Sequence, residues 1–360
     1  MASASCPPQR ASKLASARCP SVARPSIRLS APSSALHHLI PLGQRMNACR
    51  SVQSRHRGSQ VASQTGRGES QPVVSPPFPS SYESMVVQAQ RALKAAIADD
   101  HLLIEVEFPP GGLETVAGDE EGNAELNATS LYMRQICRTF ESDGSAKTTR
   151  VFFPDKTELS IATKGRAWTS SDGIRGPENS AIEASFADWP GPVDFLTDPS
   201  FMTESGLGRF FGAKKLSGQR VADRVPDSDE RFICAYPGAS LNEMVSVGEL
   251  YEDTCIVTGR PVVVVNGELD RIRSGYYPPF WSRTEMQYLK TIVPKFEQAY
   301  YIHNFKGSRP AVLFRAYPGP WQLYKRDVRT GDTALIYEQE EFISLSEAAL
   351  NLIPRYWGSV

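Results

Sequence analysis

Charged and aromatic side chains are concentrated in residues 266–277, which directly follow four consecutive valines. The carboxylates in this segment could coordinate a cation or accept hydrogen bonds from a ligand. Its guanidinium groups could bind a carboxylate or a phosphate in bidentate fashion. The candidate contact residues for a partner or a ligand are Asn266, Glu268, Asp270, Arg271, Arg273, Tyr276 and Tyr277.

Three interpretations of this segment are open. Its carboxylates could pair with its own guanidinium groups and order the loop. It could form a partner or ligand surface, because Tyr, Trp and Arg are enriched at interfaces. It could also be catalytic. A second aromatic and proline-rich loop, residues 317–321, adds Tyr317 and Trp321 as candidate contacts, and this loop could lie near the first or close a sheet edge.

The sequence lacks the motifs that accompany common catalytic sites. Residues 206–212 resemble a glycine-rich dinucleotide loop but have one residue too many before the third glycine. No P-loop, G-x-S-x-G or H-E-x-x-H motif occurs. His303 could act as an acid or base, although a hydrogen-bonded histidine near a helix end is the commoner role. We therefore expect no catalytic residue, no metal site, no cofactor and no enzymatic activity.

The valine run predicts a short strand that is buried on both faces, as in a parallel sheet. In open α/β sheets, ligands bind beyond the carboxyl ends of the strands, so its position makes residues 266–277 a site candidate. Strand and helix patterns alternate through most of the chain, which indicates right-handed crossovers. The predicted fold is α/β: a mostly parallel sheet with helices on both faces and an antiparallel hairpin at the C-terminal edge.

Local patterns place several elements. Alternation over residues 102–108 predicts a half-exposed strand with Glu105 and Glu107 on its outer face. The edge hairpin is predicted from residues 312–314 and 335–337, and a short helix at residues 193–197. Helix starts are expected at Ser80, Asn127, Ser240, Ser344, and either Ser282 or Thr284.

Proline residues modify two of these predicted helices. The helix that starts near Thr284 is expected to run through Tyr300 with a kink at Pro294. The last helix is expected to end at Pro354.

The first 68 residues differ in composition from the rest of the chain. They contain no Asp or Glu, ten basic residues and thirteen Ser. Such a stretch is typical of an organelle transit peptide, for which a plastid is favoured over a mitochondrion, and a basic tail that binds nucleic acid is the alternative. We expect residues 1–68 to be a disordered chloroplast transit peptide, residues 69–80 a Pro-rich linker, and residues 81–357 a single α/β domain.

The remainder of the chain is acidic. Residues 69–360 hold 29 basic and 40 acidic residues, a formal charge of −11. This charge argues against binding nucleic acid by general attraction. No apolar run approaches the roughly 18 residues of a membrane span, so no transmembrane segment is expected, although peripheral membrane association stays open. Cys137, Cys234 and Cys255 lack metal-binding spacing and are expected to be buried.

Three long blocks, residues 266–279, 300–307 and 312–321, resemble the plastid Low PSII Accumulation family, a domain-of-unknown-function family of plants, algae and cyanobacteria. Residues 152–155 and 189–191 also fit this family, and the resemblance spans residues 77–357. It implies a stromal or thylakoid-associated factor that assists assembly of the chlorophyll-binding core subunits of photosystem II. The implied partners are those subunits or the thylakoid insertion machinery, and no catalytic residue is implied.

Two other hypotheses compete with the assembly factor. The chain could be a small-molecule or nucleotide-binding module, enzymatic or not, that uses residues 266–277. It could also be a scaffold in which this loop serves only its own fold.

Overall fold

The computed structural model describes residues 75–116, 122–165, 183–197, 220–238, 240–277 and 283–358. The expectations for the transit peptide, for the start of the linker and for residues 206–212 lie outside this part of the chain. The strands are β1 (Leu103–Glu107), β2 (Thr149–Phe153), β3 (Val193–Phe195), β4 (Arg231–Ala235), β5 (Val262–Val265), β6 (Glu297–Phe305), β7 (Ala311–Ala316), β8 (Trp321–Arg326) and β9 (Thr333–Gln339).

Helices alternate with the strands up to β6. The α-helices are α1 (Tyr82–Ala98), α2 (Gly122–Ser142), α3 (Lys156–Lys164), α4 (Leu241–Leu250), α5 (Ile256–Thr258), α6 (Leu269–Arg273), α7 (Arg283–Ile292), α8 (Leu345–Glu347) and α9 (Ile353–Tyr356). The 3₁₀ helices are η1 (Ser145–Thr148), η4 (Val221–Arg224) and η6 (Val293–Lys295), and the π-helical segments are η5 (Tyr251–Cys255) and η7 (Ala348–Leu352).

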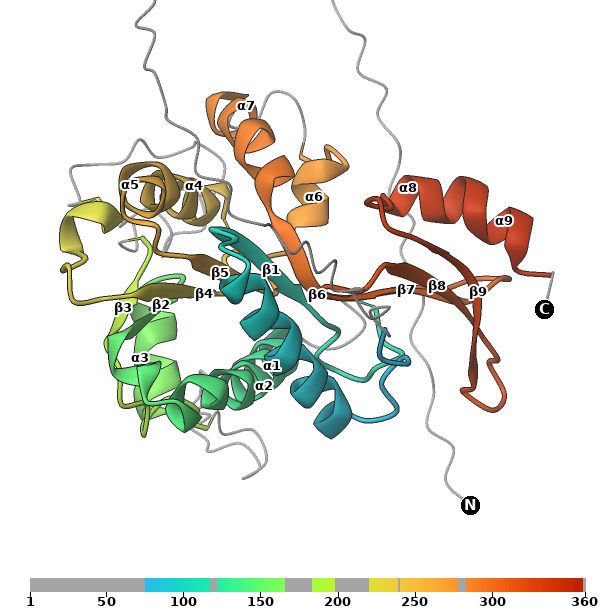
Figure 1. The fold of residues 1–360 in the computed structure, drawn as a ribbon, viewed down its shortest axis with the longest axis horizontal. Coiled ribbons are helices and arrows are strands. Elements are labelled where there is room, and N and C mark those ends of the chain that lie inside the picture. Colours follow the sequence, from blue (N-terminus) through green and yellow to red (C-terminus); the bar gives the residue numbers. More distant parts are fainter. Residues whose placement is uncertain are drawn as a thin grey trace, which may run out of the picture. The chain divides into compact units, whose positions relative to one another are not determined.

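The described strands form one sheet in the order β3-β2-β4-β5-β1-β6-β7-β8-β9. Neighbouring strands are parallel from β3 to β6 and antiparallel from β6 to β9. The predicted class, a mostly parallel α/β sheet with antiparallel strands at the C-terminal edge, is confirmed. The predicted hairpin itself is wrong, because residues 312–314 (β7) and 335–337 (β9) do not pair with each other. Strand β8 lies between them in an antiparallel β6-β7-β8-β9 meander (Figure 1).

Helices cover both faces of this sheet, as predicted. Helices α1, α2 and α3 pack on one face, and α4, α6, α7 and the α8–α9 segment pack on the other (Figure 1). Strand β5 lies in the middle of the parallel part, where all four of its valines are buried. Because successive side chains alternate between the two faces, Val263 and Val265 join one apolar core and Val262 and Val264 the other.

Two helix predictions are wrong, and one strand was missed. The helix expected to reach Tyr300 ends at Ile292, and a 3₁₀ turn containing Pro294 leads into β6. Strand β8 was not predicted. The helix expected at residues 193–197 is instead the edge strand β3. The i, i+4 spacing of apolar residues continues from α7 across Pro294, which gives the strand a false helical pattern.

The predicted helix starts at Ser240 and Ser344 are confirmed, since both side chains accept backbone N–H bonds in the first turn. The first helix is capped by Ser81, one residue later than predicted. The start predicted at Asn127 is wrong, because Asn127 lies inside α2. Of the two alternatives for the next helix, Thr284 lies inside α7, which begins at Arg283, and Ser282 lies outside the described residues.

Two expected boundaries, at Pro354 and at the end of the linker, differ from the structure. Pro354 does not end the last helix, because it lies in α9, which directly continues the π-helical segment η7. The end of the expected linker packs on the core: Phe78 meets Phe314 edge to face at 5.6 Å between ring centroids.

Cys137, Cys234 and Cys255 are buried and free, as predicted. No helix in the described ranges has the length and apolarity to cross a bilayer.

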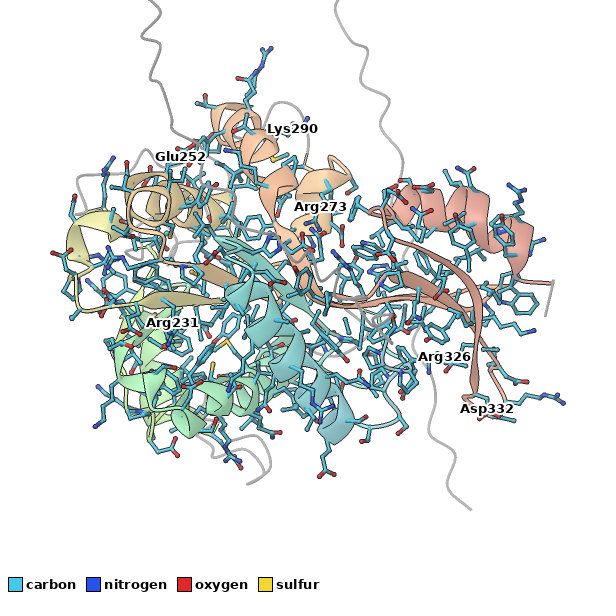
Figure 2. All side chains as sticks on the ribbon, in the orientation of Figure 1. Arg231, Glu252, Arg273, Lys290, Arg326 and Asp332 are labelled. Carbon is cyan, nitrogen blue, oxygen red and sulfur yellow. The ribbon has the colours of Figure 1, made fainter. Side chains whose placement is uncertain are left out.

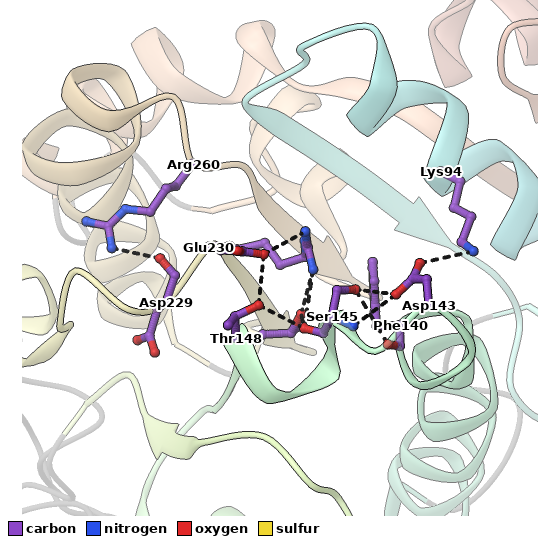
Figure 3. Close-up of polar contacts among 10 residues, drawn as sticks. Lys94, Phe140, Asp143, Ser145, Thr148, Asp229, Glu230 and Arg260 are labelled. Carbon is purple, nitrogen blue, oxygen red and sulfur yellow. Dashed lines mark hydrogen bonds and ion pairs between the residues drawn. The ribbon is translucent and has the colours of Figure 1, made fainter.

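Polar side chains near the amino ends of β2 and β4 are engaged with one another (Figure 3). Thr148 donates to Glu230 Oε2 at 2.8 Å, and Arg260 donates to the Asp229 carbonyl at 2.9 Å. Lys94 pairs with Asp143 at 3.2 Å. These contacts connect η1, the strand starts and α1, so this end of the sheet is closed by the fold's own groups.

Candidate functional site

The carboxyl ends of β4 and β5 carry unusual backbone geometry. Tyr236 after β4 has a φ of 33°, and Asn266 and Glu268 after β5 have φ values of 49° and 50°. A left-handed conformation costs a non-glycine residue about 1–3 kcal/mol and is found preferentially at functional sites. Two adjacent strands therefore end in strained turns at the same edge of the sheet.

Asn266 joins two strands and a helix. Its Oδ1 accepts from the Phe108 N–H at 2.9 Å, and its Nδ2 donates to the Phe108 carbonyl at 3.0 Å and to Thr129 Oγ1 at 3.3 Å. The amide thereby satisfies the backbone of the residue that follows β1. Asn266 was a predicted contact residue, and its polar groups serve mainly to fix the loop.

Arg273 and Asp270 belong to a buried ion network. Arg273 is bound by Glu105 and, at 3.2 Å, by Asp270 Oδ1. Gln298 donates to Glu105 at 3.0 Å, and the Tyr301 hydroxyl donates to Asp270 Oδ2. Arg273, labelled in Figure 2, is the last residue of α6. Internal pairing, one of the three interpretations from the sequence, therefore describes these two residues.

The network corrects the prediction for β1. Glu105 was expected on an exposed face, yet it is 0% exposed. Strand β1 is paired on both sides, with β5 and β6, and helices cover both of its faces. Burial alone would lower the pKa of Arg273, but the Glu105 and Asp270 carboxylates raise it above its usual range. The guanidinium is thus held charged inside the protein by its partners.

Glu268 and Arg271 form a more open pair at the same loop. Their side chains lie 2.6 Å apart, and both are partly exposed. Arg271 also lies over the ring of Tyr276, 5.9 Å from its centroid. Tyr276 is 72% exposed, whereas Tyr277 packs partly against the core beneath α4 and α6. Arg271 and Tyr276 are therefore the predicted contact residues that face outward most.

The second aromatic loop does not supply an exposed tryptophan. Trp321 is fully buried in β8, where it packs against Tyr301 at 5.2 Å between ring centroids. Its predicted role as a contact residue is wrong, because no surface of its side chain is accessible. Tyr317 binds Asp99 at 2.7 Å and lies 3.1 Å from the His101 ring, so it ties the β7–β8 loop to the end of α1.

A cavity of about 430 Å³ opens at the carboxyl ends of the parallel strands. Its volume falls within the range of about 300–1,000 Å³ that small-molecule sites occupy. Predicted residues Asn266, Glu268 and Arg271 line it, but Asp270, Arg273, Tyr276, Tyr277, Tyr317 and Trp321 do not. The remaining lining residues are Glu107, Phe108, Pro109, Pro110, Thr115, Val116, Glu125, Leu126, Thr129, Pro154, Asp155, Glu158, Tyr236, Gly238, Glu243, Ile302, His303 and Asn304.

The cavity is rich in carboxylates from several elements. They are Glu107, Glu125, Asp155, Glu158, Glu243 and Glu268. Among the described lining residues, Arg271 is the one that carries a guanidinium or ammonium group. The wall therefore has a strong excess of groups that are negative when ionised.

Burial shifts the pKa values of several lining residues. The pKa of Glu107 is raised well above its ordinary value of 4.5, first by burial and then by the charges of Glu105, Asp270 and Glu268. Burial also raises the pKa of Glu268 and lowers that of His303. A carboxyl group and an imidazole that both favour their neutral forms thus face one cavity, a pattern that occurs at functional sites more often than elsewhere.

Most of this cavity was not predicted from the sequence. Glu107 was assigned to an exposed strand face, and Glu243, which follows the predicted helix start at Ser240, was not among the predicted contact residues. His303 lies in β6 rather than near a helix end. The available signal was that Asp155 and Asn266 follow the apolar runs at residues 151–153 and 262–265, and that Tyr236 ends the apolar run at residues 232–236. In the described ranges, no group of three or more His, Cys, Asp or Glu side chains has a geometry that would hold a metal ion.

The fold and the cavity define an α/β protein of the open-sheet type with a strand-end pocket. A model of the family described as "Domain of unknown function (DUF1995)" matches residues 79–350, and the chain belongs to this family. No curated protein matches the chain. No solved structure matches it either.

Proposed function

We propose that the protein is a non-enzymatic factor that assists the accumulation of photosystem II in the chloroplast, by aiding assembly of the chlorophyll-binding core subunits. The observation that carries this proposal is the resemblance of residues 266–279, 300–307 and 312–321 to the Low PSII Accumulation family, among which the third protein of that name is the nearest type. Membership of a family of unknown function is compatible with it. The composition of residues 1–68 supports a plastid address.

The partners in this proposal are the core subunits themselves or the thylakoid insertion machinery. The outward-facing pair of Arg271 and Tyr276 is the best contact candidate beside the loop, because Arg and Tyr are enriched in interface hot spots. The protein would act from the stroma or from the thylakoid surface.

Crosslinking in intact plastids tests this proposal. We expect photosystem II core subunits or insertion components among the proteins crosslinked to the wild-type chain. Their recovery should fall in the double variant Arg271→Ala/Tyr276→Ala and persist in Arg329→Ala, a control in the exposed turn after β8. Absence of both groups of proteins from the wild-type crosslinks would refute the proposal.

The strand-end cavity favours a second candidate function, a small-molecule-binding module. Its volume, its position and its strained flanking turns are the features of a ligand site. A thermal-shift screen with nucleotides, pigment precursors, amines and metal ions tests it. A bound ligand should raise the unfolding temperature of the wild type, and Glu268→Ala should abolish the shift whereas Glu340→Ala, an exposed control, should not.

A further inference from the structure

We propose that the strand-end cavity takes a cationic ligand group, a protonated amine or guanidinium, rather than the phosphate that sites at this position of α/β sheets commonly bind. The inference rests on the second candidate function, that the cavity binds a ligand at all. It concerns the chemical class of that ligand.

The placement of the carboxylates carries the argument. Helix N-termini attract anions, because their unsatisfied N–H groups and the helix dipole favour negative charge. Three helices begin at this cavity, and each already has an acidic side chain there: Glu125 in the first turn of α2, Asp155 as the N-cap of α3, and Glu243 in the first turn of α4. Each helix end that could attract a phosphate thus already carries a carboxyl group of the protein's own.

At the N-terminus of α3, the N-cap residue Asp155 already binds the backbone N–H groups that could otherwise bind a phosphate. One oxygen of Asp155 accepts from the backbone N–H groups of Thr157 at 2.7 Å and Glu158 at 2.9 Å. These donors are therefore engaged with an internal anion. A phosphate brought to the same helix end would meet the Asp155 charge before it met a free N–H.

The other polar groups add little positive charge. Arg271 is the lining cation, and Glu268 pairs with it at 2.6 Å. Burial lowers the pKa of His303, so its imidazole favours the neutral form. A phosphate in the cavity would lack a free cation among the described lining residues. An amine or guanidinium would instead meet carboxyl groups from the ends of β1 and β5 and from the first turns of α2, α3 and α4.

Apolar walls fit the carbon skeleton that would carry the cation. Phe108, Pro109 and Leu126 line one part of the cavity, and Pro154 and Ile302 another. A small organic amine or a basic side chain of a polypeptide would satisfy this combination of charge and apolar surface equally well. A bare metal ion fits less well, because it has no apolar part and no metal-holding group occurs in the described ranges.

Isothermal calorimetry on the full chain tests the inference with probes of different charge. Agmatine and butylamine represent the free cation, and an acetylated Gly-Lys-Gly amide represents a basic side chain of a polypeptide. Inorganic phosphate and ATP are the anionic probes, and butanol is the neutral one. We expect an amine or guanidinium probe to bind and phosphate and ATP not to bind. The relative affinities of agmatine and the peptide distinguish the two sources of the cation.

Matched variants locate the binding. Glu243→Gln and Glu268→Gln each remove one charge from the cavity and should weaken agmatine binding about tenfold, the loss expected for one charge-assisted contact. Glu340→Gln removes the same charge from an exposed position outside the cavity and should bind like the wild type. Far-ultraviolet circular dichroism of each variant confirms that it is folded.

The outcomes separate this inference from the function on which it rests. If ATP, phosphate or butanol binds instead and Glu243→Gln changes that binding, the cavity is a ligand site but its ligand is not cationic. If no probe of any charge binds, the inference and the second candidate function both fall. Equal agmatine binding in the cavity variants and in Glu340→Gln would show nonspecific attraction to an acidic protein and would also overturn the inference.

Discussion

Arg271 and Arg273 lie two residues apart on α6, yet their surroundings are opposite. Arg273 is buried against Glu105, a carboxylate with no exposed surface, whereas Arg271 pairs with Glu268 at the accessible wall of the cavity. An exposed pair contributes about 0–1 kcal/mol, because water already solvates both charges. Removing one partner of a buried pair leaves the other charge buried without a counter-ion, which lowers the free energy of unfolding by about 3–5 kcal/mol.

This contrast makes a direct prediction for stability. Arg273→Met should lower the free energy of unfolding by about 3–5 kcal/mol, because it leaves the Glu105 carboxylate buried without its cation. Arg271→Met, the matched control on the same helix, should change it by at most about 1 kcal/mol. Urea unfolding followed by tryptophan fluorescence measures both. Equal effects of the two substitutions would contradict the buried network.

Glu107 makes a prediction for pH dependence. Because its folded-state pKa lies well above 4.5, the folded chain holds this proton more tightly than the unfolded chain does. Its stabilising contribution is complete below pH 4.5 and is lost as the pH rises through the raised folded value. Glu107→Gln stays neutral and can still accept the Glu268 N–H, so it should unfold about 2 °C or more above the wild type near pH 8.

The comparison of two pH values supplies the control for Glu107. Near pH 4 the wild-type carboxyl group is neutral, so the wild type and Glu107→Gln should melt at about the same temperature. A variant that is less stable than the wild type at pH 8 would show that the fold favours the ionised carboxylate, which would contradict the raised pKa of Glu107.

At the scale of elements, the sequence predicted a strand or a helix start best where a single local pattern determines it. The valines of β5 predicted a doubly buried parallel strand, and Ser240 and Ser344 predicted two helix starts. The prediction that one face of β1 is exposed was wrong. Glu105 and Glu107 alternate with apolar residues, and this pattern fits an exposed face as well as a face that is buried under an ion network. Which of the two holds depends on Arg273, which lies 168 residues away in the chain.

The cavity was harder to predict than the fold for the same reason. It is assembled from segments that follow β1, β2, β4 and β5 and from residues 302–304 within β6, and the spatial order of those strands differs from their order in the chain. Each segment alone resembles an ordinary turn or helix cap. Only the sheet topology brings Asp155, Tyr236 and Asn266 to one edge.

Gly191, in the loop before β3, packs closely against η1 and the start of β2, and this contact predicts a loss of stability on substitution. A methyl group on Gly191 would collide with the backbone carbonyl oxygens of Ala146 and Thr149. Gly191→Ala should therefore lower the free energy of unfolding by about 1–3 kcal/mol, because rigid backbone atoms must move. Gly358→Ala, where nothing lies within 4 Å, is the control and should leave stability unchanged. Equal denaturant midpoints for the two variants would contradict this packing.

At the scale of the whole molecule, the two ends of the parallel strands differ. The amino ends near Thr148 and Asp229 are closed by internal contacts, while the carboxyl ends open onto an acidic cavity. The blocks that resemble the Low PSII Accumulation family include the loop after β5 and run through β6 into β8. The residues behind the proposed function and those behind the proposed ligand site thus overlap at one edge of the sheet.

The proposed role in photosystem II accumulation can be tested in the chloroplast by depletion of the protein followed by rescue. The quantity to measure is the steady-state amount of photosystem II core subunits relative to photosystem I subunits. We expect this ratio to fall on depletion and to return with the wild-type chain, but not with the chain that lacks residues 1–68. An unchanged ratio in fully depleted chloroplasts would contradict the proposed role.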